Sequence, residues 1–379
     1  MKTRMISRVL PCVAILTCAV AWPWAVGAAL AESFAAPRFE EQILFKAGDG
    51  GYHCYRIPSL VATDRGSVLA FCEARKHNCN DDGDIDLVMR RSLDGGRTWD
   101  KARVIADEGA HTAGNPCPVV ERQSGTVWLL FCRDNKRVLL MKGTDDAQTW
   151  SRPAEVTKSV VDRSWHWVGT GPGHGIQLSR GRLLVPCWAD ATPRLGEAQF
   201  SYVFYSDDKG DTWKLGGALD RNASDECEVV ERSDGTLYMN MRSRQGKNRR
   251  ACATSNDGGT TWSPVKYDAQ LPEPSCQGSL VRWTDRRRHD KGRVLLAAPA
   301  DPSRRAQMTV RLSYDECLTW PVAKVVHQGS AAYCDLAVSQ DLTGLLLYEA
   351  DEYSKISLAR FNLEWVTDDK DHVGARAGP

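Results

Sequence analysis

The chain has 379 residues, with 49 Lys and Arg against 48 Asp and Glu, and a net charge of +1. This balance, with no extended run of like charges, argues against a nucleic-acid partner. The length is enough for one large domain and little else.

The first 31 residues have the pattern of a secretory signal peptide. Basic residues precede an apolar stretch over residues 9–26, and a small-x-small site follows at residues 29–31. Such a segment is removed on export. We therefore expect a secreted or periplasmic protein without stable membrane insertion. The alternative is a retained membrane anchor, because the apolar stretch is long, although Pro11 and Pro23 interrupt it.

Five segments end in a variant of Ser-x-Asp-x-Gly-x-Thr-Trp, here called Asp-boxes. They occupy residues 92–99, 143–150, 206–213, 255–262 and 313–320. A period of about 50 to 60 residues is typical of a propeller blade and too long for most helical solenoids. In each box the Asp can accept backbone hydrogen bonds, the Gly supplies a positive φ, and the Trp folds under the turn. We therefore interpret the boxes as structural turns, not as catalytic sites.

A turn with Gly followed by an apolar strand recurs six times. The turns contain Gly66, Gly125, Gly181, Gly235, Gly292 and Gly344. No segment shows sustained helical periodicity. We predict an all-β, six-bladed β-propeller over residues 32–366, followed by a polar tail over residues 367–379. The sixth unit has no box, and we expect the strand of residues 42–45 to pair into it and close the ring.

Thirteen cysteines are present, of which Cys12 and Cys18 fall within the signal peptide. The eleven that remain are an odd number, which requires a free thiol or an intermolecular bond. Cys72, Cys132 and Cys187 lie inside apolar strands, where Cys serves as a small hydrophobic residue. No pair of Cys or His residues has zinc spacing, so we predict no metal and no cofactor.

Three arginines stand beside strands of different units. Arg56 lies in Tyr-Arg-Ile-Pro before the first strands, Arg242 ends an alternating strand, and Arg305 precedes the strand at residues 310–312. An arginine among apolar residues is costly unless it meets an anion, and the guanidinium fork matches a carboxylate. We expect the three to converge on one carboxylate, although each alone could be a solvated surface side chain.

The Tyr-Arg-Ile-Pro segment followed by repeated Asp-boxes resembles the sialidase (neuraminidase) family, specifically the exo-acting enzymes of glycoside hydrolase family 33. The resemblance covers about residues 40–365. It implies that Arg56, Arg242 and Arg305 bind the carboxylate of the substrate and that Glu349 holds the first of them.

The resemblance also implies Tyr333 as the nucleophile, Glu226 as its base and Asp81 as the acid/base residue. Cys334 follows the tyrosine where the family usually has a small residue. Sialic acid carries a carboxylate on its anomeric carbon, so a neutral tyrosine avoids the repulsion that a carboxylate nucleophile would meet. A phenol with a pKa of about 10 needs a base within reach.

Several assignments have an alternative. Asp82 could replace its neighbour as the acid/base residue, and Arg244 or Arg304 could replace the nearby carboxylate-binding arginine. Glu73 and Arg75 match a Glu-x-Arg that faces the sugar in the family, or they form a structural ion pair.

A stretch rich in aromatic residues and glycine could also contribute to the site. Residues 164–167 and 171–175 could line the glycerol or N-acyl side of a sugar pocket, or pack beneath a blade. His53 and His174 are not expected to be metal ligands.

We predict a monomeric, secreted exo-α-sialidase that hydrolyses terminal sialic acids of glycoproteins, glycolipids and oligosaccharides with retention. The alternatives are a trans-sialidase, a sialic-acid-binding lectin without catalysis and a propeller scaffold. Tyr333, Glu226 and Asp81 together argue against a lectin, because a binder would need only the arginines. A scaffold would need none of these residues.

Overall fold

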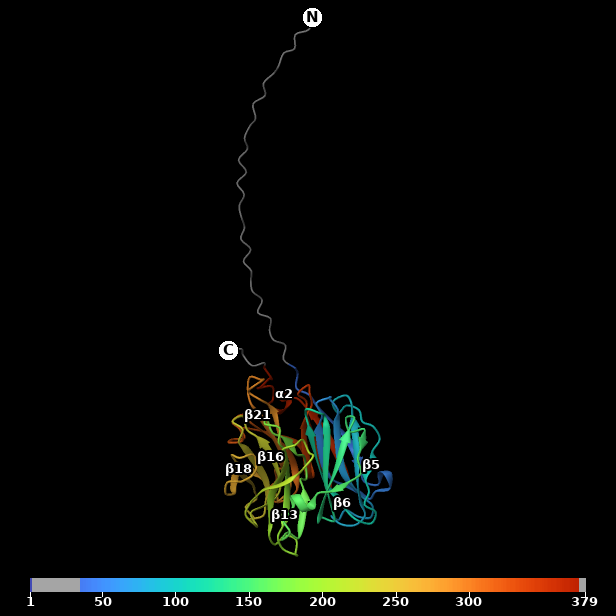
Figure 1. Ribbon diagram of the computed structural model, residues 1–379. Coiled ribbons are helices and arrows are strands. Elements are labelled where there is room, and N and C mark those ends of the chain that lie inside the picture. Colours follow the sequence, from blue (N-terminus) through green and yellow to red (C-terminus); the bar gives the residue numbers. More distant parts are fainter. Residues whose placement is uncertain (2–34, 375–379) are drawn as a thin grey trace. The chain divides into compact units, whose positions relative to one another are not determined.

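The computed structural model describes Met1 and residues 35–374, so the predicted signal peptide, apart from Met1, lies outside the described residues. The described part consists of strands and of three short helices, η1 (Asp49–Gly51), α1 (Thr157–Val160) and α2 (Leu363–Val366). None of the helices described is long and apolar enough to cross a membrane. The predicted all-β class is confirmed (Figure 1).

The strands form five hydrogen-bonded antiparallel sheets that follow one another along the chain (Figure 1). The first contains β2 (Cys54–Ala62), β3 (Val68–Arg75), β4 (Ile85–Ser92) and β5 (Arg103–Ala106). The second contains β6 (Ala113–Glu121), β7 (Thr126–Arg133), β8 (Arg137–Thr144), β9 (Thr149–Trp150) and β10 (Ala154–Glu155).

The third and fourth sheets repeat this layout. The third contains β11 (Trp167–Thr170), β12 (Ile176–Gln177), β13 (Leu183–Asp190), β14 (Gln199–Ser206) and β15 (Lys214–Ala218). Its first strand is split, since β11 and β12 both pair with β13 and residues 171–175 lie between them. The fourth contains β16 (Ser224–Glu231), β17 (Leu237–Ser243), β18 (Arg249–Ser255) and β19 (Lys266–Pro272).

The fifth sheet is larger, with seven strands. It contains β20 (Ser279–Thr284), β21 (Arg293–Pro299), β22 (Ala306–Ser313), β23 (Val322–Val338), β24 (Gly344–Ala350), β25 (Lys355–Phe361) and β1 (Phe39–Lys46). The first half of β23 pairs with β22 and the second half pairs with β24. An apolar layer that includes Leu295 and Phe361 packs the two ends of this sheet against each other. Counted by hydrogen bonding, there are therefore five sheets where the sequence predicts six blades, because the long β23 joins two sets of strands.

Apolar layers lie between consecutive sheets around the whole ring. Phe71 and Phe131 share the layer between the first and second sheets, and Leu60 and Leu358 share the layer between the first sheet and the last strands. Because both faces of each sheet are covered, middle strands such as β3 and β13 are buried at every residue and begin as continuous apolar runs, with charged residues only near their ends. The predicted propeller arrangement is confirmed.

The N-terminal strand completes the last sheet. β1 pairs antiparallel with β25, with Phe39 opposite Phe361, which confirms the predicted closure of the ring. The cysteines that were expected to act as small hydrophobic residues, Cys72, Cys132 and Cys187, are buried and unpaired, which is also as predicted.

The Asp-boxes form the expected turns. In the first box, Asp94 accepts hydrogen bonds from the backbone N–H and the hydroxyl of Thr98 at 2.9 and 2.7 Å, and the indole of Trp99 donates to the carbonyl of Gly96 at 3.1 Å. Partial burial raises the pKa of Asp94, but the hydrogen bonds from Thr98 and Ser92 outweigh it and lower this pKa to about 2. The second box departs from the others. There Asp146 accepts from Thr63 and Ser67 of the neighbouring hairpin and ties the two sheets together.

Trp213→Ala should destabilise the protein by about 3 to 5 kcal/mol, because a large buried side chain is removed from a packed layer. Trp213 is 4% exposed, packs edge-on against Trp128 and Phe204, and donates to the carbonyl of Gly210 at 3.0 Å. Thermal and urea unfolding followed by circular dichroism would measure the change. Trp167→Ala, which removes a half-buried indole, is the control and should cost much less. Equal losses in the two variants would contradict a structural role specific to the box.

Candidate active site

The site is built where strand ladders are interrupted. β-bulges occur between Arg56 and Ser59, Gly114 and Cys117, Ser224 and Cys227, and Ala331 and Cys334. A bulge adds a residue to one strand and re-aims the side chains beside it. Arg56, Glu226 and Tyr333 lie at three of these bulges, on β2, β16 and β23. Three residues that are far apart in the sequence, on three different sheets, thus contribute polar side chains to one place.

Glu349 of β24 holds two of these bulges together. It is fully buried and accepts from Arg56 Nε at 2.8 Å and Nη2 at 3.3 Å. The same carboxylate accepts the backbone N–H groups of Ile57 at 2.9 Å and of Tyr333 at 3.0 Å. Burial acts to lower the pKa of Arg56, but the charge of Glu349 outweighs it and raises that pKa well above its usual range. One carboxylate therefore fixes the direction of Arg56 and the backbone of Tyr333.

The hydroxyl of Tyr333 lies between the carboxylate of Glu226 and the guanidinium of Arg242. It donates a short hydrogen bond to Glu226 Oε1 and accepts from Arg242 Nη1 at 3.0 Å. Arg242, from β17, also donates to Glu226 Oε2 at 2.8 Å and to the hydroxyl of Ser275 at 3.3 Å. Burial and the charge of Glu226 raise the pKa of Tyr333 well above 10, while Arg242 and Arg305 oppose the shift. The phenol is therefore neutral at any working pH, and Glu226 is placed to take its proton.

Arg305 is the cation of the site that has no acid partner. Within residues 35–374 its guanidinium makes no ion pair, and its contacts are the hydroxyl of Tyr353 at 3.4 Å and the carbonyl of Ser275 at 3.3 Å. It also lies over the ring of Tyr333, 5.3 Å from the ring centre. A partly buried arginine without a carboxylate is a ready site for an anion.

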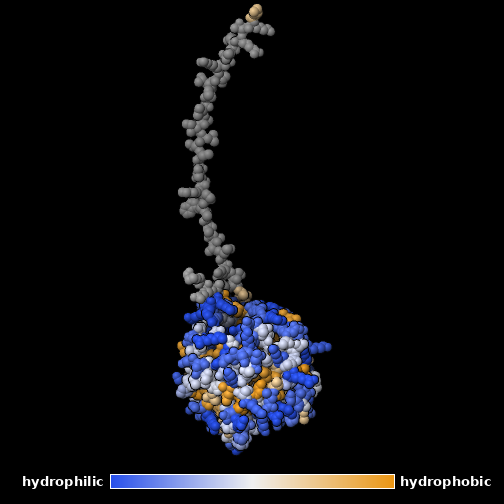
Figure 2. Space-filling view, viewed as in Figure 1, coloured by the Kyte–Doolittle hydropathy of each residue, from blue (hydrophilic) through white to orange (hydrophobic). Residues whose placement is uncertain are grey.

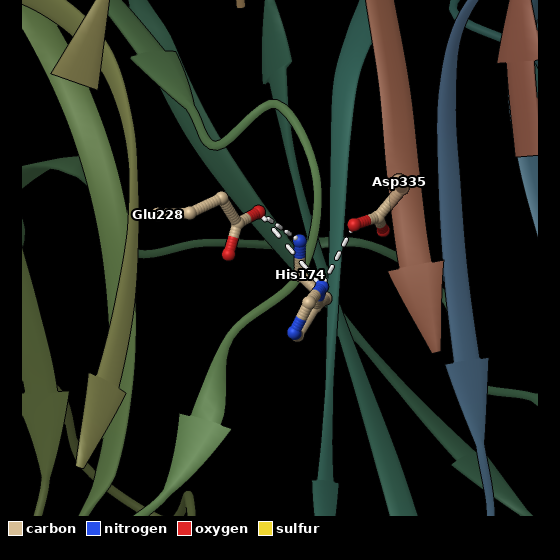
Figure 3. Close-up of side chains that lie close together, drawn as sticks. All are labelled: His174, Glu228 and Asp335. Carbon is tan, nitrogen blue, oxygen red and sulfur yellow. Dashed lines mark hydrogen bonds and ion pairs between the residues drawn. The ribbon is translucent and has the colours of Figure 1, made fainter. Parts of the chain in front are cut away.

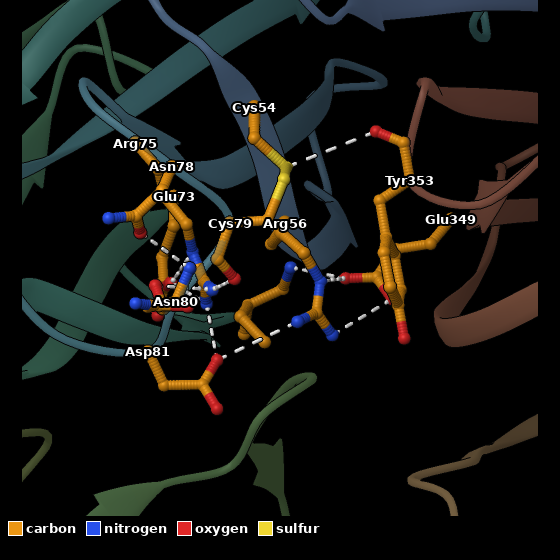
Figure 4. Close-up of a disulfide and its surroundings, with 11 residues drawn as sticks. Cys54, Arg56, Glu73, Arg75, Asn78, Cys79, Asn80, Asp81, Glu349 and Tyr353 are labelled. Atoms are coloured by element: carbon orange, nitrogen blue, oxygen red, sulfur yellow. Dashed lines mark hydrogen bonds and ion pairs between the residues drawn. A yellow bond between two sulfur atoms is a disulfide. The ribbon is translucent and has the colours of Figure 1, made fainter.

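Asp81 reaches the same region from the loop between β3 and β4 (Figure 4). Its side chain is 78% exposed, and its carboxylate lies 2.9 Å from Arg75 Nη2 and 3.6 Å from Arg56 Nη1. Arg75 also donates to the carbonyls of Cys79 and Asn80 at 2.5 and 2.6 Å. The loop is thus held by the guanidinium of Arg75, and its carboxylate stays accessible to solvent.

Glu73 and Arg75 form a buried ion pair, which is the structural alternative considered for them. The guanidinium of Arg75 donates to Glu73 at 3.0 and 2.5 Å, and Glu73 also accepts from the backbone of Asn115 at 2.8 Å. Both side chains are nearly inaccessible to solvent. The pair therefore fixes the guanidinium of Arg75, which in turn holds the Asp81 loop through its contacts with Cys79, Asn80 and Asp81.

The alternative residues lie in different surroundings. Asp225 lies 3.6 Å from both Arg242 and Arg244, but it is Arg242 that also contacts Glu226 and Tyr333. Arg304 is 76% exposed and pairs with Asp301 at 3.0 Å. Of the adjacent Asp81 and Asp82, Asp81 is the one that forms ion pairs with Arg56 and Arg75 among the residues described. The geometry therefore favours Arg242, Arg305 and Asp81 over their neighbours.

The aromatic stretch before the site packs beneath a blade. Trp165 lies edge-on to Phe200 and Tyr202, with ring centres 5.1 and 4.6 Å apart. His174 is buried beside Asp335 and Glu228. These contacts support the packing alternative for both parts of the stretch.

Comparison with known proteins agrees with this geometry. A family model described as "BNR repeat-like domain" matches residues 66–347. The chain belongs to this family. Relatives of this BNR-repeat protein include a "Sialidase" of Micromonospora viridifaciens, 32% identical over 87% of this chain and 55% of the relative. An "Exo-alpha-sialidase" of Aspergillus fumigatus is 29% identical over 88% of this chain and 92% of the relative.

A solved structure, "Hadza microbial sialidase Hz136", superimposes with a TM-score of 0.77 at 29% identity, over 85% of this chain and 68% of that one. The BNR-repeat protein thus spans about half of its bacterial relative and nearly all of the fungal one. The family resemblance seen in the sequence is confirmed, and these relatives are named as sialidases.

Four features of the site of this BNR-repeat protein were not predicted from its sequence. They are the Cys54–Cys79 disulfide, the ring of Tyr353 under Arg56 at 4.1 Å, Ser275 between Arg242 and Arg305, and Asp225. Burial and the neighbouring Glu226 raise the pKa of Asp225 to about 7. The position of Asp225 next to Glu226 was the one available signal, since adjacent acids on a strand end are unusual in a buried element.

A solvent-open cavity of about 370 Å³ adjoins the site of the BNR-repeat protein. It meets the site at Ser275, and its lining includes Ser243, Arg244, Lys247 and Asn248. Its walls are mostly polar and carry charges of both signs, from Arg244, Lys247 and Glu273, as suits a hydroxylated ligand.

Proposed function

We propose that the protein is an exo-α-sialidase that hydrolyses terminal sialic acids of glycoconjugates with retention of configuration. The observation that carries the proposal is the Tyr333 hydroxyl held between Glu226 and Arg242, beside the guanidinium of Arg305, which has no carboxylate partner among the residues described. Arg56, Arg242 and Arg305 provide the cationic side of the site, and the substrate carboxylate would bind there. The sialidase names of the relatives support the same substrate class.

The proposed reaction has two steps. In the first, the oxygen of Tyr333 attacks the anomeric carbon, Glu226 takes the phenol proton, and Asp81 protonates the departing glycosidic oxygen as the bond to it breaks. In the second, Asp81 takes a proton from water as the water oxygen attacks the anomeric carbon, and the tyrosine leaves with the proton of Glu226. Two inversions give net retention.

The remaining sequence predictions fit this role. We infer that the seven-stranded sheet is two blades that share β23, which gives six blades, and that residues 1–31 direct export. The large exposed hydrophobic residues lie on separate elements, and small apolar patches on a mostly hydrophilic face (Figure 2) support a monomer.

One assay tests the proposal. The purified protein is incubated with an aryl α-sialoside, with release of the phenol followed by absorbance and the first-formed sugar observed by proton NMR. We expect release of sialic acid as the α-anomer. Absence of turnover on α2-3-, α2-6- and α2-8-linked substrates would contradict it. A product other than free sialic acid would indicate a transferase.

Asp81→Ala should affect substrates according to their leaving group. Loss of a general acid costs about 100-fold or more with a sugar leaving group, because the departing alkoxide must be protonated. With an acidic phenol the same variant should lose less than about tenfold. The ratio of kcat/KM for sialyllactose and for an aryl sialoside measures this. Asp82→Ala is the control, and the same leaving-group dependence there would transfer the role to Asp82.

A further inference from the structure

Residues 171–175 form a loop whose hydrogen bonds connect several sheets close to the site. The loop connects β11 to β12, and its hydrogen bonds reach Ser59 of β2, Pro118 of β6 and Gln277 just before β20, at 2.8, 2.8 and 3.3 Å. The loop thus touches three other sheets from inside the ring.

His174 carries the central contacts of this loop (Figure 3). Its backbone N–H donates to Glu228 Oε1 at 2.8 Å, and its ring Nδ1 lies 2.8 Å from Asp335 Oδ1. Asp335 also accepts the backbone N–H of Leu60 and the hydroxyl of Ser279, each at 2.7 Å. His174 is 6% exposed, and both carboxylates are fully buried. Four sheets therefore meet at one buried imidazole and one carboxylate.

The two carboxylates stand on the strands that carry the proposed catalytic pair. Glu228 is two residues after Glu226 on β16, and Asp335 is two residues after Tyr333 on β23. Those strands belong to different sheets and share no ladder. His174 directly bridges the two strands, and its partners are each two residues after Glu226 and Tyr333.

The two carboxylates favour a proton on the imidazole. Burial opposes a charge on the ring, but Glu228 and Asp335 outweigh it and raise the pKa of His174 to about 9. Burial in turn raises the pKa of Glu228 well above its usual range. The other groups that interact with this cluster are Arg250 on β18, which lowers the pKa of Glu228, and the buried thiols of Cys117, Cys227 and Cys334, whose own pKa values the two carboxylates raise. At neutral pH the imidazolium therefore supplies the positive charge that Asp335 needs.

The same three side chains have a spacing that a metal ion could use, since one ligand atom of each lies within 4.8 Å of the others. The hydrogen bonds favour a protonated ring instead. The oxygens of Asp335 and Glu228 that face His174 already accept protein donors, and Glu228 Oε2 is the one oxygen of these two carboxylates that has no hydrogen-bond partner among the residues described.

We propose that His174 is a positioning residue whose imidazolium, held between Glu228 and Asp335, sets the separation of β16 and β23 and thereby aligns Glu226 with Tyr333. The kinetic part of this inference depends on the proposed function. The charge and the bridge do not.

His174→Gln tests the alignment. We expect kcat on an aryl α-sialoside to fall by about tenfold to a hundredfold, since small misplacements of reacting groups have effects of this size. KM should change by less than about threefold, because His174 contacts none of the three arginines among the residues described. His111→Gln is the matched control, since His111 also pairs with an aspartate, at 2.9 Å, but is 51% exposed. A His174→Gln variant that is folded and has normal kcat would overturn the proposal, whatever its melting temperature.

A second set of measurements needs no turnover. By ¹⁵N-histidine NMR of the wild-type chain, His174 should titrate near pH 9, against about 6.5 for an ordinary histidine. A raised pKa stabilises the fold fully below about pH 6.5 and loses its effect as pH rises through 9. The amount by which the melting temperature of the wild type exceeds that of His174→Gln should therefore decrease as the pH is raised from about 6.5 to about 9. If that variant does not fold, Glu228→Gln, which keeps the shape and one acceptor, should lower the titration midpoint and kcat.

The outcomes separate the two proposals. A midpoint at or below 6.5 overturns the charged bridge. A midpoint near 9 in a wild-type protein without sialidase activity overturns the proposed function and confirms the bridge alone. A midpoint near 9 together with unchanged kcat in both variants limits His174 to stability and overturns positioning.

Discussion

Tyr333→Phe is expected to lower kcat by about a thousandfold or more while leaving sialic-acid binding nearly unchanged, because one hydroxyl is removed and the three arginines stay. Burial and Glu226 raise the pKa of the tyrosine well above 10, and in the proposed mechanism it would become a nucleophile only as Glu226 takes its proton. Steady-state kinetics and calorimetric titration with a sialic acid analogue measure the two quantities. Tyr353→Phe is the control, because the hydroxyl of Tyr353 makes only a 3.4 Å contact with Arg305.

Covalent trapping tests the same residue directly. A 3-fluoro sialosyl fluoride should label the wild-type protein, because the ring fluorine slows breakdown of the intermediate more than the fluoride leaving group slows its formation. The label should map by peptide mass spectrometry to Tyr333 and be absent from the Phe variant. Glu226→Ala should slow labelling without preventing it. A label on Asp81 or Glu226, or a first product with inverted configuration, would contradict the tyrosine mechanism and leave the family assignment intact.

Arg305→Ala should leave a folded protein in which kcat/KM falls by about 30- to 4,000-fold, the equivalent of about 2 to 5 kcal/mol for a buried charge pair. Its guanidinium has no carboxylate partner among residues 35–374, so in the proposed complex the substrate would be that partner. Circular dichroism checks the fold, and kinetics with an aryl α-sialoside measures the loss.

Arg304→Ala is the matched control for this variant. The two arginines are adjacent, but Arg304 is 76% exposed and pairs with Asp301. It should retain near-normal kcat/KM, since exposed pairs contribute little. If Arg304→Ala were the inactive variant, the third carboxylate-binding arginine would be misassigned.

The sequence predicted the propeller well because its signals are local. Four of the five Asp-boxes complete their own hydrogen bonds within about five residues, as Asp94 does with Thr98 and Ser92, so the motif can be recognised without tertiary information. The number of sheets was not predictable in the same way. β23 continues from one ladder into the next without a break, and nothing in residues 322–338 marks that change of partner.

The site was only partly predictable. Arg56, Arg242 and Tyr333 could be found by family resemblance, and the structure brings them together. Ser275 and the His174 bridge could not, because their partners lie on other sheets and no spacing rule connects them. Long-range pairs of this kind are set by the closed ring and not by any local pattern.

Pairing of β1 with β25 also imposes an order on folding. Phe39 and Phe361 are opposite each other, although more than 300 residues separate them along the chain. During synthesis the strand of residues 39–46 has no partner until the last strand has emerged, and closing so long a loop is slow compared with forming a hairpin. Until then both strands are open sheet edges, which can pair with a second nascent chain. The ring therefore becomes resistant to aggregation only in its final step.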